Sequence, residues 1–306
     1  MEFRHLVSFL AIAEERHFGR AAAKVHLTQP SLSQQLQRLE RSLGVVLVAR
    51  SSHEVRLTPA GEVLRAHADG IVRQLERAAE AARAAAAGRF GTVRVGYTFA
   101  SWQDVLPAAL VRMHQRFPDV TVELRESRSG PQLSALSSGD LDVAFAHGGA
   151  VTTDLAHRCL LSVPIVALVG ARHPWAARAR VRFAELADQH CILFDRKQSP
   201  AMYDAIRAAA ERTGTRLAVD RHVDDPSGTA IIVATQPLVG FVSAQRGEHA
   251  RAGGLGAVPV ALTDPVPTVD LHAVWRAGET SRAVRAFLSC VTHDPTTLSN
   301  CPDRSE

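Results

Sequence analysis

The chain has no long apolar run. Its 306 residues contain no stretch of about 18 consecutive apolar residues, which is the length that a membrane-spanning helix needs. The first residues, MEFRHLVSFLAIAEERHF, carry Glu2, Glu14 and Glu15 around a broken apolar run. A signal peptide needs a basic start and a continuous apolar core, and this segment has neither. We therefore expect a cytoplasmic protein that does not contact the membrane.

Cysteine is scarce, and the motifs of common enzymes are missing. The four cysteines, at positions 159, 191, 290 and 301, form no C-x-x-C pair. In a reducing compartment we expect free thiols packed as small apolar groups, with a redox switch or metal site as the alternative. The 14 histidines show no metal-ligand spacing, and no phosphate-binding loop, dinucleotide loop, H-E-x-x-H or G-x-S-x-G motif occurs. We therefore expect no metal, no cofactor and no catalytic residues.

The positive charge lies almost entirely in the N-terminal part. Residues 1–90 hold 13 basic and 9 acidic side chains, whereas residues 91–306 hold 22 of each, so the net charge of +4 belongs to the first segment. This asymmetry favours contact with a polyanion, although a soluble domain can carry the same charge. The length and the apolar content of 46% fit two or three globular domains.

The N-terminal pattern predicts a helix-turn-helix. Helical spacing of apolar residues predicts one helix over residues 3–13 and a second from Phe18 to Val25. A third helix is expected after Thr28, a good N-cap, with Pro30 in its first turn and Gly44 at its end. Its buried face would be Leu32, Leu36, Leu39 and Leu43, and its outer face is polar and basic: Ser31, Ser33, Gln34, Gln37, Arg38 and Arg41. Such a face is either a solvated surface or a recognition surface for the major groove.

Two short β-prone runs follow, at residues 45–48 and 54–58, and they predict a β-hairpin wing beside the third helix. The string FGRAAAKVHLTQPSLSQQLQRLERSLGVVLVAR, followed by VRLTPAG, resembles the DNA-binding domain of the LysR-type transcriptional regulators. The resemblance covers about residues 2–65 and implies binding to double-stranded promoter DNA.

The resemblance assigns roles to individual residues of this unit. It implies that Thr28, Arg50 and Arg56 contact phosphates, that Arg38 belongs to the DNA-binding face, and that base edges meet Gln29, Pro30, Ser31, Ser33 and Gln34. The chain departs from the family pattern at Val48, where Phe is usual, and at the wing tip, where Ser52 and His53 replace arginines. Fewer fixed charges predict a flatter salt dependence of DNA binding.

A long helix is predicted over residues 59–87. Its residues Leu64, Ala68, Ile71, Leu75, Ala78 and Ala82 repeat at 4-3-4-3-4 spacing, which is the pattern of a coiled-coil seam. Packing on its own domain is the alternative, but such a length favours a dimer seam that presents two DNA-binding heads.

From residue 92 onward, alternating strand and helix patterns predict an α/β fold with largely parallel sheets. Strands are expected at 93–98, 120–126, 141–146, 163–169, 191–195, 217–223, 238–242, 257–262 and 271–275, and helices at 104–117, 131–138, 199–213, 226–235 and 280–291. Chain crossings are expected near Pro164 and at residues 265–267.

This half resembles the effector-binding region of the same family, and it is most similar to regulators of aromatic-compound catabolism. The resemblance rests on segments such as VRVGYT, GDLDVAF and LFDRKQSPAMY. It implies two subdomains like those of periplasmic binding proteins. We expect a winged helix-turn-helix domain at 1–58, a linker helix and hinge at 59–91, and a regulatory domain at 92–306, with subdomain I at 92–163 and 266–292 and subdomain II at 164–265.

Ligands of open α/β folds bind beyond the carboxyl ends of strands, near helix N-termini that favour anions. By position in the family, the effector would contact Ala100, Ser129, Ala201 and Tyr203, with Ser101 replacing the hydroxyl that Ala100 lacks, and His147 standing where many relatives carry Arg. Hydroxyls and nearby aromatic rings predict a small organic acid, aromatic or derived from ring cleavage.

Together these features predict a ligand-responsive transcriptional regulator that activates a metabolic gene cluster. By resemblance it would form a homo-oligomer, a tetramer built as a dimer of dimers, with RNA polymerase as a further candidate partner. Two alternatives stay open from the residues alone. One is an enzyme with an ancillary DNA-binding head, and the other is a cytoplasmic solute-binding protein.

Overall fold

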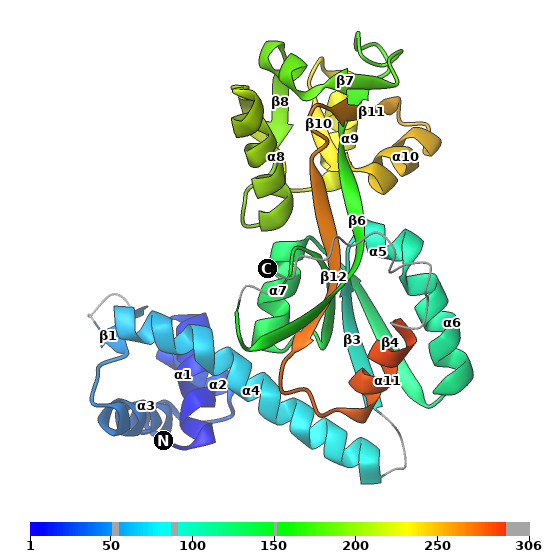
Figure 1. The fold of residues 1–306 in the computed structure, drawn as a ribbon. Helices are drawn as coiled ribbons and strands as arrows, with labels where there is room; N and C mark the ends of the chain where they lie inside the picture. The colour runs from blue at the N-terminus through cyan, green and yellow to red at the C-terminus, as the bar shows by residue number, and fades with distance from the viewer. Residues whose placement is uncertain (51–54, 87–90, 150–151, 292–306) are drawn as a thin grey trace. The chain divides into compact units, whose positions relative to one another are not determined.

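The computed structural model describes residues 1–50, 55–86, 91–149 and 152–291 (Figure 1). Contacts divide the chain into two compact units, the first reaching from Met1 to Gly88 and the second holding most of the remaining chain. The predicted wing-tip residues Ser52 and His53 and the predicted hinge at Gly88 lie outside the described residues. No helix in the described ranges is both long enough and apolar enough to cross a bilayer.

The first unit contains the predicted winged helix-turn-helix. Its elements are α1 (Phe3–Glu15), α2 (Phe18–Lys24), α3 (Gln29–Leu43), β1 (Val48–Arg50), β2 (Val55–Leu57) and α4 (Pro59–Ala86). The core places α1 and α2 against the apolar face of α3, whose Leu32, Leu36 and Leu39 are fully buried. The predicted strand at 45–48 is wrong for residues 45–47. Val45 and Val46 are exposed, and antiparallel pairing with β2 begins at Val48 and continues to Arg50.

One carboxylate fastens the base of the wing to α3. Glu40 Oε1 accepts hydrogen bonds from the backbone N–H groups of Leu47 and Val48, at 2.8 and 3.2 Å. On the other strand of the wing, the Thr58 hydroxyl donates to the Val46 carbonyl at 2.7 Å and accepts from the Gly61 N–H at 3.1 Å. The same threonine therefore closes the wing and caps the start of α4.

The predicted seam of α4 divides into two parts. Ala68 is buried in the core of the first unit, and Leu64 packs against that core. Farther along the helix, Ile71 and Leu75 are 44% and 49% exposed. Leu64 and Ala68 therefore pack on the helix's own domain, which was the alternative prediction. Ile71 and Leu75 are not covered by other described residues of this chain.

The second unit is built on an eight-stranded mixed sheet in the order β4-β3-β5-β12-β6-β11-β7, with β10 also paired to β6. A separate parallel pair joins β8 to β9. The strands are β3 (Gly91–Tyr97), β4 (Val120–Glu126), β5 (Val143–His147), β6 (Leu155–Gly170), β7 (Arg180–Arg182), β8 (His190–Leu193), β9 (Ala218–His222), β10 (Gly240–Ser243), β11 (Ala257–Thr263) and β12 (Thr268–Arg276).

The expectation of largely parallel sheets is wrong for this unit. Strand β12 pairs antiparallel with β5 and β6, and β6 pairs antiparallel with β10 and β11. The cause is the 16-residue strand β6, which was expected only over 163–169. It pairs with β12 up to Pro164 and with β10 and β11 from Ile165 onward, so β6 belongs to both subdomains (Figure 1). This change of partner lies at the predicted crossing near Pro164.

The helices of this unit are α5 (Phe99–Asp104), α6 (Leu106–Arg116), α7 (Ser129–Ser138), α8 (Pro200–Thr213), α9 (Pro226–Thr235), α10 (Ala244–Ala252) and α11 (Arg282–Val291), with a 3-10 turn η1 at Phe183–Asp188. Helices pack against inner strands of the sheet, with α9 on β6, α10 on β11 and α11 on β3. The separate helices α5 and α10 were not predicted. The sequence AQRGEHARA of α10 has little apolar surface, and its Gly247 lies over Pro259 of β11.

Two of the cysteines match the expectation of buried free thiols. Cys191 and Cys290 are both free and fully buried. Burial raises the pKa of the Cys191 thiol to about 12, with a further contribution from Asp220, so this thiol is protonated at neutral pH and is a poor nucleophile. Cys159 is disulfide-bonded, so the expectation of a free thiol is wrong there.

Gly61 provides a test of the wing anchorage. A Cβ at this position would collide with the backbone carbonyl of Leu47, whereas a Cβ at Gly70, in the same helix, would meet no atom nearer than 3.6 Å. We expect Gly61→Ala to lower the free energy of unfolding by about 1–3 kcal/mol through overpacking. Gly70→Ala should raise it by about 0.5–1 kcal/mol through helix propensity. Urea unfolding followed by circular dichroism measures both, and equal stability of the two variants would contradict this account.

Candidate DNA interface and effector cavity

The recognition helix α3 is capped as predicted. Thr28 lies just before the helix, and its Oγ1 accepts from the Ser31 N–H at 3.4 Å and lies 2.9 Å from the Ser31 hydroxyl. Pro30 is in the first turn, and Gly44 ends the helix. A hydrogen bond of 2.6 Å from the Ser8 hydroxyl to Gln35 Oε1 ties α1 to α3.

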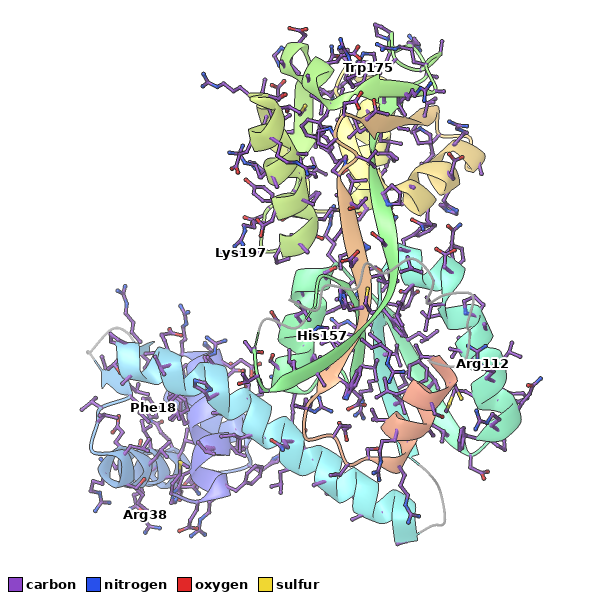
Figure 2. All side chains as sticks on the ribbon, in the orientation of Figure 1. Phe18, Arg38, Arg112, His157, Trp175 and Lys197 are labelled. Atoms are coloured by element: carbon purple, nitrogen blue, oxygen red, sulfur yellow. The ribbon has the colours of Figure 1, made fainter. Side chains whose placement is uncertain are left out.

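The predicted DNA-binding residues lie together on the outer face of this unit. The exposed residues are Thr28, Gln29, Pro30, Gln34 and Arg38, whereas Ser31 and Ser33 are half-buried in the first turns of α3. Figure 2 labels Arg38 on this helix. Arg56 is exposed on β2. Arg50 ends β1, but its side chain lies outside the described part of the structure.

Ion pairs remove part of the predicted basic charge from this face. Lys24 Nζ lies 2.5 Å from Glu14, and Arg20 Nε lies 3.1 Å from Glu15, so both cations are paired within the unit. The exposed positive charge on α3 is therefore carried by Arg38 and Arg41. Composition alone overstated the local charge, because it does not show which acids lie beside which bases.

A cavity of about 330 Å³ lies between the two subdomains of the second unit. Its wall collects the first turns of five helices, α5, α7, α8, α9 and α10, around the carboxyl end of β5. The lining residues are Thr98, Phe99, Ala100, Glu126, Ser127, Arg128, Ser129, His147, Ser199, Met202, Asp225, Pro226, Ser227, Phe241, Val242, Ser243 and Arg246.

Three of the six predicted effector residues line this cavity. Ala100 and Ser129 are fully buried in its wall, and His147 ends β5 beside them. The backbone N–H of His147 donates to Ser129 Oγ at 2.9 Å.

The other three predicted effector residues do not line the cavity. The Ser101 hydroxyl donates to the Thr98 carbonyl at 2.7 Å, so it caps α5 and does not replace the hydroxyl that Ala100 lacks. Ala201 and Tyr203 flank Met202 on α8, and helical geometry turns them away when Met202 faces the cavity. The Tyr203 ring packs instead against Phe194, with 6.4 Å between ring centroids.

Two arginines that the sequence did not single out face each other across the cavity. The Arg246 guanidinium lies 2.6 Å from Glu126 and 4.5 Å above the centroid of the Phe99 ring. Arg128 Nε donates to the Asp224 carbonyl, and its guanidinium lies 4.6 Å from the centroid of Phe194. Burial, with a contribution from Arg246, lowers the pKa of Arg128 to about 10, so Arg128 is a cation with incomplete compensation at neutral pH.

Helix capping decides which N-terminus is open to a ligand. Asp225 accepts from the N–H groups of Ser227 and Gly228 and so caps α9, while Ser243 caps α10 by accepting from Arg246 N–H. The Ser199 side chain makes no such bond at the start of α8, although Ser199 is buried and lines the cavity. The start of α8 therefore presents uncapped backbone donors to the cavity that Arg128 also lines, a combination that favours an anion.

These two units define the class of protein: a winged helix-turn-helix DNA-binding head joined to a two-subdomain, ligand-binding half. Comparison with known proteins agrees. Residues 3–62 match the family of bacterial regulatory helix-turn-helix proteins of the lysR type, and residues 86–294 match the LysR substrate binding domain. The chain belongs to the LysR family. It is thus a ligand-responsive, DNA-binding regulator of transcription and not an enzyme.

Relatives and solved structures cover nearly the whole chain. The chain is 31% identical to the uncharacterized HTH-type transcriptional regulator YnfL of Escherichia coli K12, over 94% of this chain and 96% of that protein. It is 32% identical to the regulator AlsR of Bacillus subtilis 168, over 80% and 78%. The fold is similar to the crystal structure of CbnR, a LysR family regulator, with a TM-score of 0.72, 24% identity and coverage of 95% and 98%. A second structure shows full-length CbnR with its target DNA, at a TM-score of 0.71.

Proposed function

We propose that this regulator senses a small organic acid in the cavity between its subdomains. The observation that carries the proposal is Arg128, a half-buried cation that lines the same cavity as the uncapped start of α8. A carboxylate there would compensate the Arg128 charge and accept from backbone donors, two interactions that favour anions. Phe99 and Phe241 in the wall favour a flat or unsaturated body, so an aromatic acid or a ring-cleavage product fits.

We further propose that α3 enters the major groove with its N-terminal turns foremost. Gln29, Ser33 and Gln34 would read base edges, with Pro30 and Ser31 packed against them, while Thr28, Arg38, Arg50 and Arg56 would contact phosphates. The support is the exposure of the α3 outer face and its rigid placement by the Thr28 cap and the leucine core. We propose that the chain consists of a winged helix-turn-helix domain at 1–58, a linker helix and hinge at 59–91, and a regulatory domain at 92–306.

The proposed assembly is a homo-oligomer joined through α4, with a dimer of dimers as its full form. The exposed Ile71 and Leu75 support this, because large apolar side chains on a helix favour burial against a partner. The proposed action is activation of a metabolic gene cluster through contact with RNA polymerase. An effector that binds one arrangement of the subdomains more tightly would shift the population of DNA-bound states.

Thermal unfolding of the full chain tests the organic-acid proposal. A ligand at about a hundred times its Kd should stabilise the regulatory half by about 2.7 kcal/mol. Aromatic acids and ring-cleavage diacids should raise Tm, whereas amines and neutral sugars should not. Arg128→Met should abolish the response, and Arg125→Met, at an exposed position on neighbouring β4, should keep it. Stabilisation by cations or sugars alone would refute the anion site.

Replacement of Gln29 by Ala tests base readout. A glutamine bidentate to adenine contributes about 1–3 kcal/mol of discrimination. The variant should therefore lose preference for the operator over random duplex while keeping most of its affinity for random DNA. Fluorescence anisotropy on both duplexes measures this, with the exposed Gln103→Ala in the regulatory half as control. An equal loss on both duplexes would place Gln29 outside the base-reading set.

The double variant Ile71→Asp, Leu75→Asp tests the α4 contact. Buried unpaired carboxylates cost several kcal/mol, about 3–5 per broken site, so the dimer and its operator footprint should be lost together. Light scattering and footprinting report the two losses. Gln74→Asp adds a carboxylate at an exposed neighbouring position and serves as the control. A double variant with unchanged mass would show that α4 is not the dimer contact.

A further inference from the structure

His147 carries a buried nitrogen with no partner. The residue is 8% exposed, lines the cavity, and its Nε2 has no hydrogen-bond partner among the described residues. Buried polar atoms in folded proteins are nearly always hydrogen-bonded, so an exception in a ligand cavity marks a position where a ligand atom completes the bond. This atom plays no part in the carboxylate subsite proposed above.

The same histidine is held neutral by its surroundings. Burial lowers the pKa of His147 to about 4, with smaller contributions from Arg128 and His272. At neutral pH the ring therefore cannot form an ion pair with a carboxylate. It offers Nε2 as one donor or one acceptor, depending on the tautomer, and both roles suit a neutral oxygen.

The unpaired nitrogen lies beside the proposed carboxylate subsite. The His147 N–H donates to Ser129 Oγ at 2.9 Å, and the next residue, Gly130, donates its N–H to the Gln198 carbonyl at 2.9 Å. An added Cβ at Gly130 would overlap the Lys197 carbonyl, so the turn at 128–130 lies directly against the loop that carries Lys197 and leads into α8 (Figure 2). His147, the turn that carries Arg128 and the start of α8 thus lie close together at one corner of the cavity.

At this corner of the cavity the charge of the wall favours one strong negative group. Among the lining residues the cations are Arg128 and Arg246, and the acids are Glu126 and Asp225. Arg246 is already paired with Glu126, and Asp225 is occupied as the cap of α9. One incompletely compensated cation faces the corner, and the group next to it is a neutral imidazole.

We propose that the effector is a hydroxy or oxo carboxylate whose neutral oxygen, on a carbon close to the carboxylate, pairs with Nε2 of His147. This inference rests on the organic-acid function proposed above and narrows its ligand class. His147 acts as a specificity residue: it distinguishes an acid that carries the neighbouring oxygen from the same acid without it.

Matched ligand pairs test the inference on the full chain by isothermal titration calorimetry. The pairs are 2-hydroxybenzoate with benzoate, and lactate or pyruvate with propionate. In at least one pair the oxygen-bearing member should bind about tenfold tighter or more, which corresponds to one buried hydrogen bond. His147→Leu should remove this ratio, and His147→Gln, which keeps a polar nitrogen at a similar reach, should retain part of it. The ratio should stay constant between pH 6 and 8, because His147 is neutral throughout.

His157→Leu is the matched control, because this ring packs against His272 at 5.2 Å between centroids but does not line the cavity. It should keep the wild-type ratio.

If the wild type binds none of these acids or any other carboxylate, the organic-acid function itself fails. If it binds acids but shows no preference within any pair, prefers only diacids, or keeps its preference in His147→Leu, only the hydroxy or oxo assignment is overturned. If His147→Leu does not fold, the ratio measured with His147→Gln decides: a ratio below that of the wild type supports the assignment, and an unchanged full ratio overturns it.

Discussion

The regulatory half depends on one continuous strand. Because β6 pairs with β12 before Pro164 and with β10 and β11 after it, the two subdomains share a single hydrogen-bonded backbone. That connection brings helices from both subdomains to one cavity, where α5 and α7 come from one side and α8, α9 and α10 from the other. The half-buried Arg128 would be costly in either subdomain alone. It is tolerated because Asp224, Asp225 and the Phe194 ring lie across the gap.

Local signals explain why the DNA-binding unit could be predicted well from the sequence. The Thr28 cap, Pro30 in the first turn, the leucine repeat and Gly44 all act within a few residues of one helix. Each is found where expected except Leu43, which was predicted on the buried face and is 39% exposed. The family resemblance named the same outer face. The division of the α4 seam was less visible, because a 4-3-4 repeat looks the same whether its partner is the helix's own domain or another copy. Only the exposure in the structure distinguishes Ala68, which is buried in its own domain, from Ile71, which is exposed.

Longer-range features escaped prediction for identifiable reasons. The strand predicted over 163–169 includes Pro164 but omits residues 155–162 of β6, so the change of strand partners and the mixed sheet were missed. Helix α10 has weak apolar periodicity and was not predicted. Its cavity residue Arg246 was therefore not predicted either. Arg128 could not be predicted as a cavity residue, because its contacts with Asp224 and Phe194 join it to positions some 66 or more residues along the chain. His147, by contrast, was placed in the effector site by family position, and its unpaired Nε2 emerged only from the structure.

The hydrogen bonds of Glu40 have a thermodynamic consequence for DNA binding. Since this carboxylate holds the backbone N–H groups of Leu47 and Val48 to the recognition helix, the base of the wing is ordered when the chain folds. The associated loss of conformational entropy belongs to folding and not to association. For this part of the interface, the heat-capacity change on operator binding should therefore reflect buried surface alone, without the larger signature that accompanies coupled folding of a segment.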